Sequence, residues 1–283
     1  MLSLQREEPP TFVDAAEPFL CVFQTPALRP QELDPRGFEE IEAFGAVSAP
    51  RWRYRIGDAR FSRTLTLDAE SDRLTVTYEF SGLAGPAELW LQPFLTYRPM
   101  HHLTFENMVL NGGVQRYDGA FRIAPYDGLP VLEMRIEGLP HEWEEGGWWH
   151  QGIHYSEEAA RGYDADEDYF SPGAFRIEIP GDCTLSFHAA VGVSAHAAVP
   201  PRAFSEPLER AADQFLIRRK DEFASIIAGY PWFGEWGRDT FIALPGLTLA
   251  TGRFDHAAAI LHSYGSSLER GLVPNLPATT GAS

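Results

Sequence analysis

The chain has 283 residues, of which 44% are hydrophobic and 22% are charged, a balance that is typical of a folded globular protein and excludes wholesale disorder. Its 23 Lys and Arg residues against 40 Asp and Glu residues leave a net charge of -17, which would repel a phosphate backbone and gain nothing at an anionic membrane surface. We therefore expect neither nucleic acid nor a membrane as a partner.

The sequence shows no sign of a metal centre, a nucleotide site or a targeting segment. Cys21 and Cys183 lie far apart and neither belongs to a CxxC pair, so we expect no disulfide framework and no structural metal. No GxGxxG or GxxxxGK[ST] motif is present, and we expect no cofactor. The N-terminus lacks the apolar stretch of a signal peptide, and the apolar segment 241–251 is too short to cross a bilayer. The sequence therefore indicates a cytoplasmic protein.

Residues 51–188 alternate between apolar and polar side chains with a period of two. The segments 52–56, 74–80 and 175–179 show this pattern, which is typical of half-buried antiparallel strands. Turn-forming residues rich in Gly, Asp and Asn separate such segments, at 57–58, 71–72, 111–113, 127–128 and 181–182. Many short strands with turns between them predict a β-sandwich domain over residues 1–196.

The pattern then changes to a helical period. A proline-containing linker is predicted at 197–205, followed by an α domain over 206–283. One apolar stripe predicts a helix over 208–216, and two more helices are predicted over about 239–250 and 255–268. The helix over 239–250 is apolar almost all round, so it needs neighbours on several sides.

Two motif candidates fail on local grounds. His150 and His154 have the i, i+4 spacing of two metal ligands on a helix, but Gly152 and its aromatic neighbours do not favour a helix there. We interpret them as structural histidines and expect no metal. The segment 192–196 lacks the second glycine of a nucleophile elbow, so it does not indicate a serine hydrolase.

Residues 142–168 combine aromatic rings with many carboxylates. Sugars present apolar C–H faces and hydroxyl groups, so their sites often pair ring platforms with carboxylate acceptors. An acidic aromatic segment can equally cover one face of a sheet and keep its charges in water. The sequence leaves both interpretations open.

The most informative stretch is 229–240, where aromatic residues and glycines precede a predicted helix. Its candidate ligand-binding residues are Trp232, Phe233, Trp236, Arg238 and Asp239. Asp239 in the first helical turn would stay ionised and accept hydroxyl hydrogen bonds, while Arg238 offers a fork of donors. The alternative is a buried Arg–Asp cap with aromatic packing. Because several ligand-friendly residue types converge here, the stretch predicts a substrate-binding site.

Residues 228–255 read AGYPWFGEWGRDTFIALPGLTLATGRFD. This segment closely resembles the opening of the helical glucosidase domain in bacterial and archaeal glycogen-debranching enzymes of the amylo-α-1,6-glucosidase type. Residues 271–275 are similar to that family's continuation, and 155–164 with 167–173 are similar to the end of its N-terminal β domain. The resemblance spans most of the chain.

The resemblance implies an N-terminal antiparallel β-supersandwich followed by the first helices of an (α/α)6 barrel. It also implies hydrolysis of α-1,6-linked glucose in α-glucans such as glycogen and limit dextrin, with inversion. In such barrels an Arg–Asp pair grips the hydroxyls of the terminal glucose, a role that falls here to Arg238 and Asp239. Trp232, Phe233 and Trp236 would then be ring platforms.

An inverting glycosidase needs two carboxyl groups, roughly 6.5 to 9.5 Å apart, with water between one of them and the sugar. The family's pair lies on later helical segments, and this sequence stops after about three. We therefore expect an incomplete family member whose catalytic acid and base lie outside it. A noncatalytic α-glucan-binding or assembly module is the alternative. A disaccharide phosphorylase would need a basic phosphate pocket, which the sequence does not show. No oligomeric state is predicted.

Overall fold

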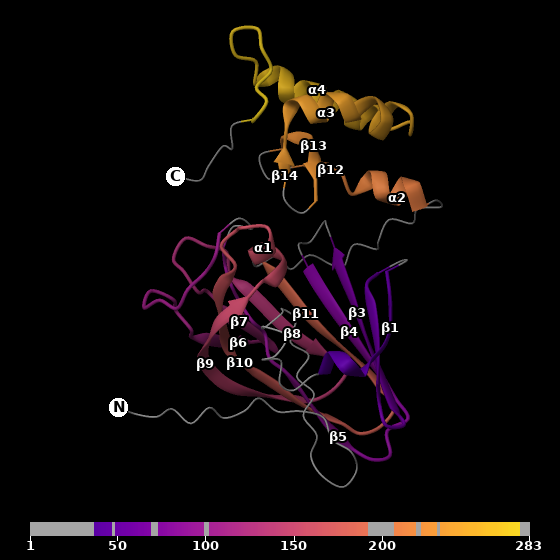
Figure 1. The fold of residues 1–283 in the computed structure, drawn as a ribbon, viewed down its shortest axis with the longest axis vertical. Coiled ribbons are helices and arrows are strands. Elements are labelled where there is room, and N and C mark those ends of the chain that lie inside the picture. Colours follow the sequence, from indigo (N-terminus) through magenta and orange to yellow (C-terminus); the bar gives the residue numbers. More distant parts are fainter. Residues whose placement is uncertain are drawn as a thin grey trace. The chain divides into compact units, whose positions relative to one another are not determined.

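The computed structural model describes residues 37–46, 49–68, 73–98, 102–191, 207–218, 222–230 and 233–277. The chain divides into two compact units, an N-terminal unit of residues 1–200 and a C-terminal unit of residues 201–283 (Figure 1). Among the described residues, no helix combines the length and apolarity that a membrane crossing requires. The predicted linker 197–205 and the predicted site residue Trp232 lie outside the described ranges.

The larger sheet of the N-terminal unit has eight strands in the order β1-β2-β3-β4-β11-β8-β7-β6, and every neighbouring pair is antiparallel. A short 3-10 helix, η1 (Gly37–Glu40), leads into it. The strands are β1 (Ile41–Gly45), β2 (Arg51–Ile56), β3 (Ala59–Asp68), β4 (Arg73–Ser81), β6 (Val114–Tyr117), β7 (Ala120–Ile123), β8 (Leu132–Glu137) and β11 (Cys183–Val191).

A second antiparallel sheet has the order β5-β10-β9. Its strands are β5 (Ala87–Leu91), β9 (His141–His154) and β10 (Asp166–Ile179), and the short helix α1 (Ser156–Ala160) joins β9 to β10. The ring of Phe175 on β10 lies 4.9 Å from that of Phe121 on β7 and 6.0 Å from that of Phe187 on β11. Side chains of the two sheets thus meet in one hydrophobic core, and the predicted antiparallel β architecture is confirmed.

Alternation places the core on one face of the larger sheet. Tyr54, Phe61 and Phe80 lie opposite one another on β2, β3 and β4, and all three are buried. The Tyr54 and Phe61 rings stack with centroids 4.4 Å apart. The hairpin between β2 and β3 turns at Gly57 and Asp58, and Gly57 has a φ of +59°, which is a favourable region for glycine.

The C-terminal unit joins helices to a small antiparallel sheet of order β12-β13-β14. Its elements are α2 (Pro207–Asp213), β12 (Leu216–Arg218), β13 (Ala224–Gly229), β14 (Phe233–Glu235), α3 (Gly237–Leu244), a π-helical turn η2 (Pro245–Leu249) and α4 (Phe254–Ser266). Helices α3 and α4 pack against β13, where Ile226, Leu244, Ile260 and Tyr264 form the centre of a second core. The described residues of this unit do not show the predicted (α/α)6 barrel.

The first predicted helix is shorter than expected. Helix α2 ends at Asp213 rather than 216, because Leu216 begins β12 and pairs with Ile226 of β13. Leu208, which the stripe predicted to be buried, is 82% exposed. Tertiary strand pairing has therefore overridden the local helical pattern, and this part of the prediction is wrong.

The second predicted helix lies in place but changes type at Pro245. Proline has no N–H to donate to the carbonyl four residues earlier, so the α-helical ladder stops at Leu244. The chain continues as a wider turn in which the Ala250 N–H donates to the Pro245 carbonyl over 2.9 Å. Helix α4 matches the third predicted helix closely, from Phe254 to Ser266.

Candidate substrate-binding site at the start of helix α3

Four of the five predicted site residues lie within one short stretch of the C-terminal unit. Phe233 is the first residue of β14 and lies opposite Gly229 of β13. Trp236 is the residue that precedes helix α3. Arg238 and Asp239 occupy the first turn of that helix. The structure thus brings Phe233, Trp236, Arg238 and Asp239 together at the helix start.

These side chains reach the surface. Phe233 is 51% exposed, and the side chains of Arg238 and Asp239 are 72% and 43% exposed. Trp236 is half-buried, and its ring meets that of Phe233 almost perpendicularly at a centroid distance of 6.5 Å. The alternative of a buried Arg–Asp cap does not describe this arrangement.

Arg238 and Asp239 remain largely free for other partners. The Arg238 Nε lies 4.0 Å from the Asp239 Oδ2, which is beyond hydrogen-bond distance. The Asp239 Oδ2 is itself shielded from solvent and has no hydrogen-bond partner among the residues that the structure describes. An acceptor left in this state costs free energy, so a hydroxyl donor that reached it would be bound favourably.

Asn275 holds the start of helix α3 from outside the helix. Its carbonyl accepts the Gly237 N–H over 2.8 Å, and its Oδ1 accepts the Arg238 N–H over 3.0 Å. Trp236 precedes the helix but provides no side-chain cap, so Asn275 satisfies donors that a capping residue would normally satisfy. A Cβ on Gly237 would lie 2.5 Å from the Pro274 carbonyl oxygen, which explains the glycine at this position.

A buried hydroxyl cluster lies beneath the same helix. The Tyr264 hydroxyl of α4 is 2.9 Å from the Ser225 Oγ of β13 and 3.1 Å from the Thr240 Oγ1 of α3. The Thr240 hydroxyl also donates to the Ile226 carbonyl over 3.2 Å. All three hydroxyl-bearing residues are at most 1% exposed. The cluster ties α3 to its two neighbours and thereby positions Arg238 and Asp239.

The acidic aromatic segment 142–168 is divided between the core and the surface. Trp143 is buried between the two sheets, whereas Trp148 is 49% and Tyr163 is 67% exposed. Its rings therefore do not form one continuous platform. Trp143 and Trp148 lie on β9, whereas Tyr163 follows helix α1.

Glu167, one of the carboxylates at the end of this region, has a structural role. It is fully buried and forms an ion pair with Arg98, whose Nη2 lies 2.6 Å from the Glu167 Oε1. The Thr104 N–H also donates to it over 3.1 Å, and so does the Tyr155 hydroxyl. Burial alone would raise the pKa of Glu167, but the bonds from Arg98, Tyr155 and Thr104 outweigh it and lower that pKa.

The two histidines considered as metal ligands have other partners. Both lie on strand β9, where residues four apart are separated by roughly 13 Å. The His154 Nδ1 is 2.7 Å from the Asp166 Oδ1, and the His150 ring packs edge-on against Phe94 with centroids 4.8 Å apart. The described part of the chain holds no group of three or more His, Cys, Asp or Glu side chains that could bind a metal ion.

Comparison with known protein families covers both units. The family model described as "Glycogen debranching enzyme N terminal" matches residues 20–185, and the model described as "Amylo-alpha-1,6-glucosidase" matches residues 210–283. These matches relate the chain to glycoside hydrolases. It belongs to the glycogen debranching enzyme family.

Individual relatives are more distant. The glycogen debranching enzyme of Saccharomyces cerevisiae is 38% identical over 123 residues, a match that covers 38% of this chain and 8% of the yeast protein. Among solved structures, a bacterial glucoamylase complexed with acarbose is similar over 55% of this chain and 24% of its own, with 12% identity and a TM-score of 0.30. This chain thus spans a small part of the yeast relative.

Proposed function

We propose that this chain supplies the β domain and part of the glucose-binding wall of an enzyme that hydrolyses α-1,6-glucosidic branch linkages in glycogen-like α-glucans. In this proposal helices α2, α3 and α4 are the first helices of an (α/α)6 barrel, and the reaction proceeds with inversion. A general acid protonates the leaving oxygen and a general base activates water. We assign neither role to a residue of this chain. A cytoplasmic location stays a prediction.

The observation that carries the proposal is the exposed Arg238–Asp239 pair at the start of helix α3. Because the two side chains lie 4.0 Å apart, each can bond to a ligand. Arg238 would donate to the ring and hydroxyl oxygens of a terminal glucose, and Asp239 would accept from its hydroxyl groups.

Aromatic residues beside the pair suit the apolar face of a sugar. The half-exposed ring of Phe233 and the adjacent Trp236 could pack on its C–H groups, with Trp232 as a further candidate. We assign Asp239 a binding role, because a carboxylate at the start of helix α3 can accept hydrogen bonds from sugar hydroxyl groups.

Affinity electrophoresis of the 283-residue chain in gels that contain glycogen tests the binding role. Asp239→Asn should weaken retention by about 10-fold or more, since a hydrogen bond to a charged group contributes about 1.5–3 kcal/mol. Asp255→Asn is the matched control, because Asp255 is an exposed acid in the first turn of α4. Equal retention of wild type and Asp239→Asn would contradict the proposal.

The catalytic assignment has its own assay. Incubation of the chain with a phosphorylase-limited dextrin should release no glucose if the acid and base lie elsewhere. Glucose release that disappears in Asp239→Ala would overturn that assignment. A noncatalytic α-glucan-binding module is the alternative function, and it predicts retention by glycogen together with the absence of glucose release from any longer form of the protein.

A further inference from the structure

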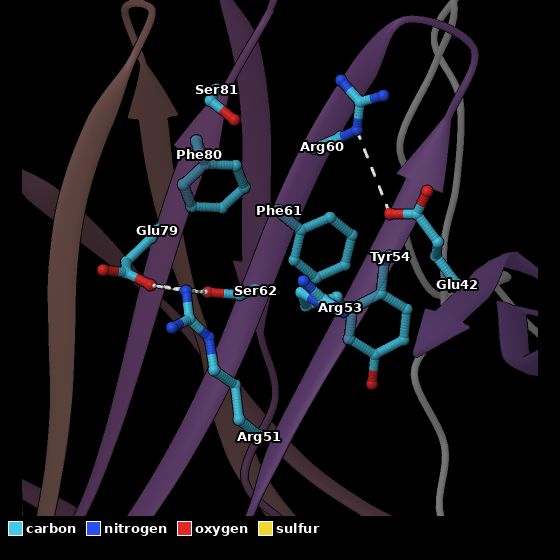
Figure 2. Close-up of a pocket in the computed structure, with 10 residues that line it drawn as sticks. All are labelled: Glu42, Arg51, Arg53, Tyr54, Arg60, Phe61, Ser62, Glu79, Phe80 and Ser81. Carbon is cyan, nitrogen blue, oxygen red and sulfur yellow. Dashed lines mark hydrogen bonds and ion pairs between the residues drawn. The ribbon is translucent and has the colours of Figure 1, made fainter. Parts of the chain in front are cut away.

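A second candidate site lies in the N-terminal unit, on strands β2, β3 and β4. A pocket of about 350 Å³ opens there (Figure 2). Its charged and hydroxyl-bearing lining includes Arg51, Arg53, Arg60, Glu42, Glu79 and Ser62. The volume falls within the range of about 300–1,000 Å³ that small-molecule sites occupy.

Strand register explains why this pocket is polar. Arg53 of β2 lies opposite Ser62 of β3, and Ser62 lies opposite Glu79 of β4. The next residues along these strands are the buried aromatic ones, so they point to the other face of the sheet. The pocket lining nevertheless includes these aromatic residues, Tyr54, Phe61 and Phe80, beside the polar ones.

Two of the three arginines are held by carboxylates. Arg51 donates to the Ser62 Oγ over 3.0 Å and also to Glu79, and Ser62 donates to the Glu79 Oε2 over 2.7 Å (Figure 2). On the other side of the pocket the Arg60 Nε lies 3.9 Å from the Glu42 Oε2. These contacts orient the guanidinium groups of Arg51 and Arg60. They leave the charge of the third arginine in the lining, Arg53, unneutralised.

Arg53 is that third arginine. Within the described ranges it makes no hydrogen bond and no ion pair, and its side chain is exposed. Three arginines against two glutamates leave the lining positive, although the whole chain carries a net charge of -17. The pKa of Glu42 responds to this field: the hydrogen bond from Arg55 lowers it, and the charges of Arg60 and Arg53 add to that effect against burial.

We propose that this pocket binds a hexose phosphate. The phosphate would lie on Arg53 with help from Arg51 and Arg60, because guanidinium forks bind phosphate oxygens in a bidentate way. The sugar hydroxyls would bond to Glu79 and Ser62, which supply an acceptor and a hydroxyl group. The residues of this pocket belong to the N-terminal unit, whereas the residues proposed to bind glucan belong to the C-terminal unit.

Isothermal titration of the 283-residue chain with glucose 6-phosphate, inorganic phosphate and glucose tests the proposal. Glucose 6-phosphate should bind at least about 10-fold more tightly than inorganic phosphate, and glucose should show no binding. Binding should weaken as the salt concentration rises, because the ligand is anionic. Inorganic phosphate that binds as tightly as glucose 6-phosphate, or glucose that binds equally well, would overturn the assignment.

Variants locate the site. Arg53→Gln should weaken glucose 6-phosphate binding by about 10-fold or more, through loss of charge-assisted hydrogen bonds. The matched control is Arg161→Gln, an exposed arginine beside helix α1 that is paired with Glu158. Because Arg53 makes no hydrogen bond or ion pair within the described part of the chain, the thermal unfolding of Arg53→Gln should match wild type. If Arg53→Gln bound glucose 6-phosphate as tightly as wild type, the proposed phosphate site would be refuted. Retention by glycogen tests only the proposed function, so the two proposals can fail separately.

Discussion

Replacing Gly237 with alanine should detach the start of helix α3 from the segment that carries Asn275. The added Cβ would lie 2.5 Å from the Pro274 carbonyl oxygen, closer than side-chain carbons approach an oxygen. The two segments must therefore separate, which breaks the bonds of 2.8 Å and 3.0 Å that Asn275 accepts from Gly237 and Arg238. Alanine also favours a helix, so the two effects oppose each other.

The hydrogen-bond effect should win. Two lost hydrogen bonds cost about 1–3 kcal/mol, whereas the helix propensity of alanine returns about 0.5–1 kcal/mol. A net loss of about 1–2 kcal/mol lowers the melting temperature of a unit of this size by about 5–10 °C. Differential scanning calorimetry measures the shift, and hydrogen exchange at the α3 amides should become faster.

Gly265 in helix α4 provides the control, because no atom of the described residues lies within 4 Å of a Cβ at that position. Gly265→Ala should leave stability unchanged or raise it by up to about 1 kcal/mol. If Gly237→Ala were as stable as Gly265→Ala, with unchanged exchange at α3, the contact with Asn275 would not be what holds the start of this helix.

Two further predictions concern buried polar groups. Tyr264→Phe should lower the free energy of unfolding by about 1–3 kcal/mol, since it removes the hydroxyl that contacts Ser225 and Thr240. Urea denaturation measures this loss. If the loss were equally large in the Ser225→Ala background, the two hydroxyl groups would not be energetically coupled, which would contradict a hydroxyl cluster. Glu167→Gln should cost about 3 kcal/mol, because it removes the carboxylate charge from the buried ion pair with Arg98. Because folding lowers the pKa of Glu167, its contribution is present above the carboxyl pKa of the unfolded chain and is lost as the pH falls through the folded value. Urea midpoints between pH 7 and pH 3 should therefore fall less steeply in Glu167→Gln than in wild type, and parallel curves would exclude this role.

Local patterns predicted most strands and helices, whereas long-range pairing could not be predicted. The alternation of apolar and polar residues over 74–80 predicts which face of β4 is buried, and this prediction needs only the residues of the strand itself. Nothing in the alternation says that β11 rather than β5 pairs with β4, because that choice depends on packing across the sandwich. The same gap explains the wrong end of helix α2, since β13 supplied a competing partner for Leu216.

The candidate residues follow the same division. Arg238 and Asp239 could be placed at a helix start from adjacent residues alone. Their support by Asn275 could not, because it joins positions 37 residues apart. The arginines of β2 indicated only a polar face, and their convergence with Ser62 depends on strand register. In the hydroxyl cluster, Thr240 gave no signal of its own within an apolar helix.

Strand β11 occupies the middle of the eight-stranded sheet although it is the last of these strands to be synthesised. Phe187 lies opposite Val76 of β4 on one side and opposite Ile136 of β8 on the other. Until residues 183–191 leave the ribosome, the edges of both β4 and β8 lack the strand that covers them, and open edges invite pairing with other chains. During synthesis the chain is therefore prone to aggregate through these open strand edges until β11 pairs with both of them.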